Sequence, residues 1–301
     1  MAEVATITEE QRRVRQLFLM QHGLNFTVSK RKLHLYNTKY NDDYNTTEFY
    51  CTVNDATKEA LGPVRSAYTV KQNHELLDLI LEKLGDGNYD LADSKGGTFD
   101  KGRKVYFFIK YNMRTDWGQE QADSYVYALS SHDGSLRLTF GISNKIHSCS
   151  NMFGILMNDK EGNHVIKHTK KIADLNNNKS LDELIKSNLL GVSSLMRKMQ
   201  NATITEDDKI IGKIINLIAD KNAKRKSAKY HVRKEKIEHS IVQEMINKGG
   251  NAYGLFNGLT HYLTHSGMVS EVDYLFGSKS KITTKALEMI VEYMKEKGCL
   301  N

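Results

Sequence analysis

The pattern of apolar and polar positions changes near the middle of the chain. From Leu24 to about Thr169 the apolar runs are short and rich in β-branched and aromatic residues, which is typical of strands. After Ala173 the apolar residues recur at helical spacing. We therefore predict an α+β protein, with a β-rich domain at 1–175 and a helical domain at 180–301. The expected strands are 24–28, 32–36, 48–53, 64–70, 104–111, 125–130, 136–142 and 164–168.

Capping signals indicate where the helices of the β-rich domain begin and end. Thr8 and Gln11 form a capping-box pattern ahead of a helix that Gly23 would end. Asn73 is the expected cap of a second helix, which Gly85 would stop. A third helix is expected at 149–157. The first half is thus predicted to be an antiparallel sheet that two helices, 73–84 and 149–157, interrupt.

The second half reads as a succession of helices. Ser180 and Glu183 form another capping box. Thr205 is the expected cap of a long helix whose apolar side runs from Ile210 to Ile218, and the basic segment described next would continue directly from it. The last two helices are predicted at 252–264 and 284–297.

The net charge of the chain is concentrated in one segment, Lys221–Lys236. Eight lysines and arginines against one glutamate give this basic segment a charge of +7, which equals the net charge of all 301 residues. Such local charge density is suited to a polyanion, because steering and phosphate contact depend on it. The alternative is a solvated connector between two apolar helices.

As a helix, the basic segment would place Lys221, Arg225, Lys229 and Arg233 on one ridge. We expect this ridge to follow a phosphate backbone. Tyr230 and His231 would offer stacking surfaces for a base. Tyr106, Tyr125 and Tyr127 could do so as well, but packing in the sheet is the interpretation that we favour for each of them. The residues of the basic segment expected to contact nucleic acid are Lys221, Lys224, Arg225, Lys226, Lys229, Arg233 and Lys234. On the β-rich half, Arg137 and Lys145 are expected to extend this path, together with Arg103 and Lys104.

Other candidate chemistry is sparser. Asp133-Gly134 is a dipeptide that tight hairpin turns prefer, so the run 131–135 is interpreted as a turn, with an acid/base or metal pair of His132 and Asp133 as the alternative. Two histidines, His261 and His265, stand one helical turn apart, which is half of a common zinc site. No glycine-rich phosphate motif is present, and we expect no cofactor. The residues considered for a metal site, which we do not expect to form, are His132, Asp133, Cys149, His168 and His265.

Composition excludes several classes of protein. The three cysteines are far apart, which fits a reducing compartment and excludes a disulfide framework. No apolar run approaches the roughly 20 residues that a bilayer crossing needs. The first ten residues are polar and acidic, unlike a secretory signal. We expect an intracellular protein with no membrane partner.

Several short strings occur together in a recognisable order. They are 23–28 (GLNFTV), 61–64 (LGPV) with Tyr68, Gln72-Asn73, 131–135 (SHDGS), Cys149 and Asn151, His168-Thr169, Tyr253, Asn257, Thr260, His265, and 275–277 (LFG). In this order they resemble the phage/plasmid-like proteins of unknown function (domain of unknown function 932), over about residues 22–290. The family usually has an RVVCQN-like run where this chain has 146–151 (IHSCSN), and an arginine where Lys167 stands. The resemblance implies a phage or mobile-element protein that acts in the cytoplasm of a bacterial host.

A looser similarity links the hairpin 125–142 and the expected helix 149–157 to the single-strand annealing proteins of phage recombination. We therefore expect a non-enzymatic DNA-binding protein of replication or recombination that prefers single strands and forms homo-oligomers. One alternative is a metal-assisted nucleic-acid hydrolase that uses the histidines, Asp133 and Cys149. Another is a virion or host-interaction protein whose basic segment is merely solvated.

Overall fold

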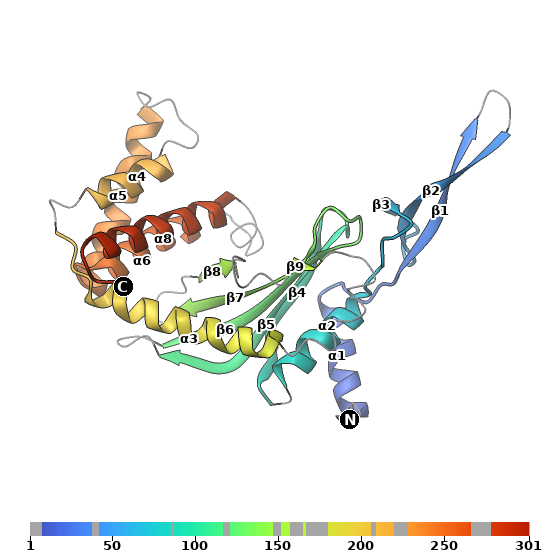
Figure 1. The fold of residues 1–301 in the computed structure, drawn as a ribbon, viewed down its shortest axis with the longest axis horizontal. Coiled ribbons are helices and arrows are strands. Elements are labelled where there is room, and N and C mark those ends of the chain that lie inside the picture. The colour runs from blue at the N-terminus through green and yellow to red at the C-terminus, as the bar shows by residue number, and fades with distance from the viewer. Residues whose placement is uncertain are drawn as a thin grey trace. The chain divides into compact units, whose positions relative to one another are not determined.

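The computed structural model describes residues 8–37, 42–85, 87–116, 121–146, 152–156, 165–166, 180–205, 209–219, 228–265 and 278–300 (Figure 1). The chain divides into two compact units. The first comprises Met1–Met113, Tyr125–Ile142 and Leu156–Lys186, and the second Arg114–Ser124, Ser143–Ile155 and Ser187–Asn301. Antiparallel sheets lie in the N-terminal half and a run of helices in the C-terminal half, so the predicted α+β class is confirmed.

Two helices of the first unit begin at capping boxes. α1 (Glu9–Gln21) follows Thr8, whose Oγ1 accepts the Gln11 N–H at 3.2 Å while Gln11 Oε1 accepts the Thr8 N–H at 2.9 Å. α2 (Asn73–Leu84) is capped by Gln72, whose N–H donates to Glu75 at 3.0 Å. The prediction that Asn73 is the cap is wrong by one residue, because the Asn73 side chain turns into the protein interior.

The first sheet has three antiparallel strands in the order β1 (Val28–Asn37), β2 (Asp42–Asn54) and β3 (Ala60–Arg65). The side-chain amide of Gln72 joins this sheet to α2, because it bonds both the N–H and the C=O of Val28 at 2.9 Å. On one face Thr52 and Val64 are buried. On the other face Arg31, Phe49 and Arg65 are exposed, whereas Val53 near the end of β2 is buried.

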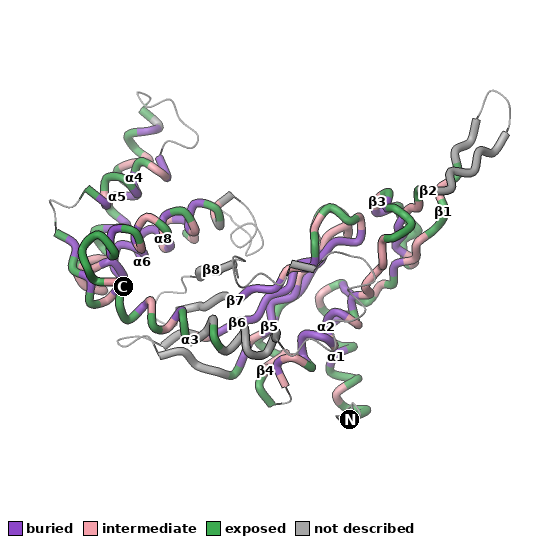
Figure 2. The backbone as a smooth tube through the Cα atoms, in the orientation of Figure 1, coloured by how far each residue is buried: buried purple, intermediate pink, exposed green. Residues whose placement is uncertain are grey.

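The second sheet runs in the order β4 (Tyr89–Phe99), β5 (Lys104–Asp116), β6 (Gln121–Ser131), β7 (Leu138–Ile146) and β8 (Met152–Leu156), with β9 (Val165–Ile166) antiparallel to β7. Figure 2 shows long buried stretches along its central strands. Tyr127 fills this core at 1% exposure, and a Cβ on Gly141 would stand 1.9 Å from its ring. Tight packing at this crossing therefore requires a glycine.

The helix predicted at 149–157 is wrong, because Met152–Leu156 forms β8, the last strand on the main path of the second sheet. The run is apolar and only five residues long. Periodicity cannot separate a buried strand from a buried helix over so short a stretch.

The helices of the C-terminal half are α3 (Ser180–Asn201), α4 (Ile210–Ala219), α5 (Ala228–Lys248), α6 (Ala252–His265) and α8 (Ser278–Glu296). From Ser187 onward they belong to the second unit, which also includes parts of β5 to β8. α6 packs along α5, and α8 contacts both α4 and α6. The α5–α6 approach is close, because a Cβ on Gly258 would lie 2.4 Å from the Cα of Ile241. None of the described helices is long and apolar enough to span a membrane.

The expected single helix from Thr205 through the basic segment is wrong, because α4 and α5 are separate helices that pack on each other. Tyr230 near the start of α5 places its hydroxyl 3.4 Å from Oδ1 of Asn216 in α4. In one straight helix, residues fourteen positions apart would be about 21 Å apart along the axis. Packing of the apolar faces of two helices buries more surface than one extended helix does.

Candidate nucleic-acid interface

The structure describes only the C-terminal part of the basic segment. Lys221, Lys224, Arg225 and Lys226 lie outside the described residues. From Ala228 onward the segment forms the first turns of α5, and Lys229 lies there, although its side chain is not described. Arg233 and Lys234 are half-buried and Lys236 is exposed.

The two sides of α5 differ in chemistry. At about 100° per residue, Tyr230, Ile237 and Ile241 fall on one side of the helix, and all three are buried. Arg233 falls on this same side, between the buried Ser240 and Glu244, whereas Lys236 lies beyond its edge and is exposed. Arg233 Nε is shielded from solvent and has no hydrogen-bond partner in the described part of the chain. Arg233 is therefore partly enclosed by the packed side of α5, and Lys236 is a surface residue.

One ion pair on α5 involves the basic segment. Lys234 Nζ lies 3.4 Å from Glu238 Oε1 at i,i+4, with both side chains about 40% exposed. An exposed pair of this kind contributes about 0.3–0.5 kcal/mol. A phosphate can therefore displace Glu238 from Lys234 at little cost.

Of the two residues on α5 expected to stack on a base, Tyr230 is buried and His231 is exposed. Tyr230 is 9% exposed, and its hydroxyl faces Asn216, so the prediction that it stacks on a base is wrong. His231 is exposed and meets the Tyr230 ring edge-on, with ring centroids 5.6 Å apart. Tyr230 is buried because it packs against α4. The helical pattern of α5 alone does not predict this contact.

The tyrosines of the first unit that were considered for stacking are buried or half-buried. Tyr125 and Tyr127 are buried, at 7% and 1% exposure, and Tyr125 stacks on Phe108 at 4.4 Å. Tyr106 is half-buried beside Gly97, where a Cβ would stand 2.8 Å from its hydroxyl. Tyr125 and Tyr127 are thus core residues, which confirms the favoured interpretation of packing in the sheet and excludes stacking on a base.

The basic residues expected on the β-rich half are dispersed. Arg137 is exposed just before β7, and Lys145 lies on β7, with its side chain outside the description. Arg103 is half-buried in the turn before β5. Lys104 Nζ pairs with Asp100 Oδ2 at 3.2 Å and lies 5.7 Å from the centre of the Phe99 ring. Arg103 and Lys104 are thus neighbours at the start of β5, and Arg137 and Lys145 belong to the β7 region.

The turn at 131–135 is confirmed, and its histidine is structural. Gly134 has φ +71°, and the Asp133 carboxylate accepts the Ser135 N–H at 2.9 Å. Burial alone would raise the pKa of Asp133, but hydrogen bonds from Ser135 and Ser131 outweigh it and lower the pKa. His132 is 1% exposed, with Nε2 3.0 Å from Oδ1 of Asn73. Its ring therefore faces the interior, away from any substrate in solution.

Residues from separate strings of the resemblance meet around this histidine. Asn73 Nδ2 donates to the carbonyl of Leu24 at 3.1 Å, and the Phe26 ring meets His132 edge-on at 5.8 Å. Tyr68 donates its hydroxyl to the Ser131 carbonyl at 2.6 Å, and burial raises the pKa of that hydroxyl. We call Leu24, Phe26, Tyr68, Asn73, Ser131 and His132 the buried polar node.

The node also fixes how the turn packs on the first sheet. A Cβ on Gly62 of β3 would stand 2.6 Å from the Cβ of Asp133. The backbone N–H of His132 donates to the carbonyl of Arg103 at 2.7 Å. These contacts tie β3, the β4–β5 turn and the β6–β7 turn together, so the strings of the resemblance describe a packing arrangement.

The metal candidates do not converge among the residues described. Cys149 and His168 lie outside them, and no group of three or more histidine, cysteine, aspartate or glutamate side chains in the described ranges is placed to hold a metal ion. His261 and His265 do lie together on α6, with ring centroids 4.5 Å apart. Burial, and then the charge of His265, lower the pKa of His261.

Ser240 is buried next to His261, as a serine nucleophile would be next to its general base, but its hydrogen bonds contradict this role. Ser240 Oγ lies 3.2 Å from Nδ1 of His261 and donates to the carbonyl of Gly258 at 2.9 Å. A hydroxyl has one proton, so His261 must donate to Ser240 through Nδ1–H. A nucleophile needs the reverse, with the histidine accepting the proton. The pair therefore fastens α5 to α6.

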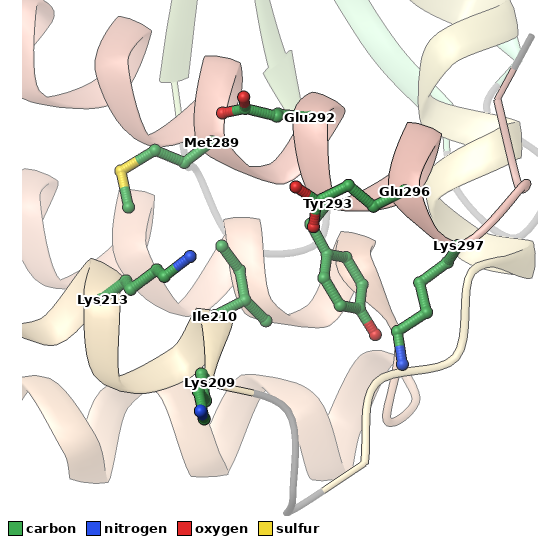
Figure 3. Close-up of a pocket in the computed structure, with 8 residues that line it drawn as sticks. All are labelled: Lys209, Ile210, Lys213, Met289, Glu292, Tyr293, Glu296 and Lys297. Atoms are coloured by element: carbon green, nitrogen blue, oxygen red, sulfur yellow. The ribbon is translucent and has the colours of Figure 1, made fainter.

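A pocket of about 370 Å³ lies between α4 and α8 in the second unit (Figure 3). Its apolar part is Ile210, Met289 and the ring of Tyr293. Three lysines and two glutamates complete the lining, which gives it a small positive excess. Sequence patterns do not predict this pocket, because its two sides are about eighty residues apart in the chain. The charged lining residues are Lys209, Lys213, Lys297, Glu292 and Glu296.

Comparison with known proteins adds one finding. Residues 60–287 match the family model described as a domain of unknown function, DUF932. The chain belongs to this family. The DUF932 match covers more than half of the chain and includes β3 to β9, the buried polar node except Leu24 and Phe26, and most of the helical unit. No curated protein and no solved structure matches the chain significantly.

Proposed function

We propose that this DUF932 protein binds nucleic acid, with a preference for single-stranded DNA, through the basic segment Lys221–Lys236. The observation that carries the proposal is the concentration of the whole net charge, +7, in sixteen residues. Neutralising phosphates with lysine and arginine releases counterions, which drives binding. The described part of the segment supports this, because Lys236 is exposed and the Lys234 side chain is 40% exposed.

The biological setting is part of the same proposal. The resemblance to phage/plasmid-like proteins suggests a role in the replication or recombination of a phage or mobile element, in the cytoplasm of a bacterial host. Annealing of single strands is the activity that we favour. It requires no catalytic residue, only a surface that holds a strand while its bases remain available for pairing.

Self-association belongs to the proposal as well. Val232, Val242 and Ile246 are 51%, 52% and 71% exposed. At about 100° per residue they lie within about 80° of one another, on the side of α5 opposite Ile237 and Ile241. An exposed apolar strip on a helix that already packs on its other side favours a second copy of the chain as a partner.

The test compares two variants with equal loss of charge. Replacing Lys224, Arg225, Lys226 and Lys229 with glutamine removes four positive charges from the basic segment. The control replaces four other lysines of the same unit with glutamine. They are Lys198 on α3 and Lys281, Lys285 and Lys295 on α8, all of which are exposed. In a gel-shift assay with single-stranded DNA we expect the first variant to lose at least tenfold in affinity and the control to lose much less.

Equal affinities for the two variants would reject the role of the basic segment. Circular dichroism melting of both variants provides the folding check. Unchanged melting temperatures are expected, because the described residues among those replaced are surface side chains.

A further inference from the structure

A second surface with the chemistry of single-strand recognition lies on the outer face of β1–β2–β3. Phe49 on β2 is directly opposite Arg65 on β3. Directly paired residues of antiparallel strands place their side chains on the same face, about 4.5–5.5 Å apart at Cβ. Phe49 is 48% exposed, and Arg65 is exposed as well.

Arg31 on β1 belongs to the same face. It pairs with Cys51, which is two residues beyond Phe49 on β2, and alternate residues of a strand share a face. The diagonal between Arg31 and Phe49 is therefore about 7–8 Å, within reach of a long side chain. An exposed aromatic ring thus stands between two arginines contributed by the two flanking strands.

The adjacent aromatic residue on β2 is covered, and Phe49 is not. Lys30 Nζ lies 4.8 Å from the centre of the Tyr50 ring on the opposite face, and it donates to the carbonyls of Ser66 and Tyr68 at 2.7 and 2.9 Å. Among the phenylalanine, tyrosine and tryptophan side chains that the structure describes, only Phe49 is exposed.

The two arginines can exchange their present contacts for phosphate. Arg65 makes no ion pair with the described residues. Arg31 Nη2 lies 3.4 Å from Asp55 Oδ1, with side chains 56% and 30% exposed, and such exposed pairs are weak. Asp55 keeps hydrogen bonds from Ser29 at 2.7 Å and Thr27 at 3.0 Å when Arg31 leaves.

We propose that this outer face binds single-stranded nucleic acid, with a base stacked on Phe49 and the flanking phosphates on Arg31 and Arg65. A free ring between cations is the arrangement with which proteins bind unpaired bases. A duplex is disfavoured because its base faces are already stacked inside the helix. The inference rests on the proposed function, since both surfaces are proposed to bind single-stranded nucleic acid, but its residues lie in the first unit and act through stacking.

The test separates stacking from charge by comparing oligothymidylate with an abasic oligonucleotide of equal length and equal phosphate number. The wild-type protein should bind oligothymidylate more tightly. Phe49→Ala should lower affinity for oligothymidylate about 5- to 100-fold and leave affinity for the abasic strand unchanged. Phe49→Trp should retain the preference for bases.

Two control variants make the outcome decisive. Leu190→Ala removes another exposed apolar side chain, at 62% exposure on α3, and should change neither affinity. The basic-segment variant should bind both strands more weakly and keep the preference for bases. If Phe49→Ala leaves that preference intact, or changes only the oligomeric state, the inference is overturned and the proposed function survives. If the wild type binds neither strand, the proposed function fails first.

Discussion

The buried polar node of the first unit and the basic segment of the second differ in what their residues do. The node contains a histidine, an asparagine and a tyrosine, residue types that often serve catalysis, yet His132 and Asn73 are 1% exposed and bonded to each other. The basic segment has no motif at all, only charge. In this protein the recognisable polar residues hold the fold together, and the residues proposed to bind nucleic acid are distinguished only by their concentrated charge.

The same division of roles holds inside the helical unit. Gly258 and the Ser240–His261 pair determine how closely α5 and α6 approach. Exposed lysines, such as Lys236 on α5 and Lys285 on α8, lie on the surface of these helices. The comparison therefore predicts that stability and nucleic-acid binding respond to different substitutions, and the following changes test this separation.

The largest effect on stability is expected at Gly258. Gly258→Ala places a Cβ 2.4 Å from the backbone of Ile241, which forces the two helices apart, and the free energy of unfolding should fall by about 3 kcal/mol. Gly212→Ala on α4 is the control, because nothing lies within 4 Å of its Cβ. It should raise the free energy of unfolding by about 0.5–1 kcal/mol. Urea unfolding gives the free energy of unfolding of both variants. Equal free energies of unfolding for Gly258→Ala and Gly212→Ala would contradict the packing described for α5 and α6.

Disrupting the buried polar node should have a slightly smaller effect. His132→Ala leaves the Asn73 amide without one of its partners and opens a cavity, so we expect a loss of about 2 kcal/mol in the free energy of unfolding. His74→Ala, at an exposed position next to Asn73 on α2, should cost less than about 0.5 kcal/mol. Under conditions where both variants are folded, DNA affinity should match the wild type. A loss of affinity in folded His132→Ala would mean that the node contributes to binding after all.

The smallest effect is the pH dependence of the helical unit. Burial lowers the pKa of His261, so the unfolded chain takes up a proton at a higher pH than the folded chain does. Stability should therefore be unaffected above about pH 7 and should decline as the pH falls below about 6.5. Melting temperatures at pH 7.5 and 5.5 measure this, and His261→Gln should reduce the decline. A decline of the same size in His261→Gln would assign it to other groups.

Local chemistry predicted the features of the fold that depend on neighbouring residues. The Thr8 capping box, the helix ends near Gly23 and Gly85 and the turn at Asp133-Gly134 all follow from backbone rules that act within a few residues. The helical character of the second half also follows, because a sustained apolar period has few alternatives.

Features that depend on distant contacts could not be predicted. The partner of Asn73 is fifty-nine residues away at His132, and packing on α4 decides that Tyr230 is buried. β8 was taken for a helix because a short apolar run fits both structures. Phe49 was overlooked because the sequence alone does not say which face of a strand is covered. Tertiary packing, rather than propensity, settles each of these cases.

The most direct test of the central claim is the salt dependence of binding to a fluorescent oligothymidylate, measured by anisotropy. If the basic segment neutralises about five phosphates, the logarithm of the association constant should fall with the logarithm of salt concentration at a slope of about −3 to −4. Neutralising Lys224, Arg225, Lys226 and Lys229 should reduce the magnitude of that slope by about 2–3. No binding in low salt, or an unchanged slope in the variant, would contradict the account.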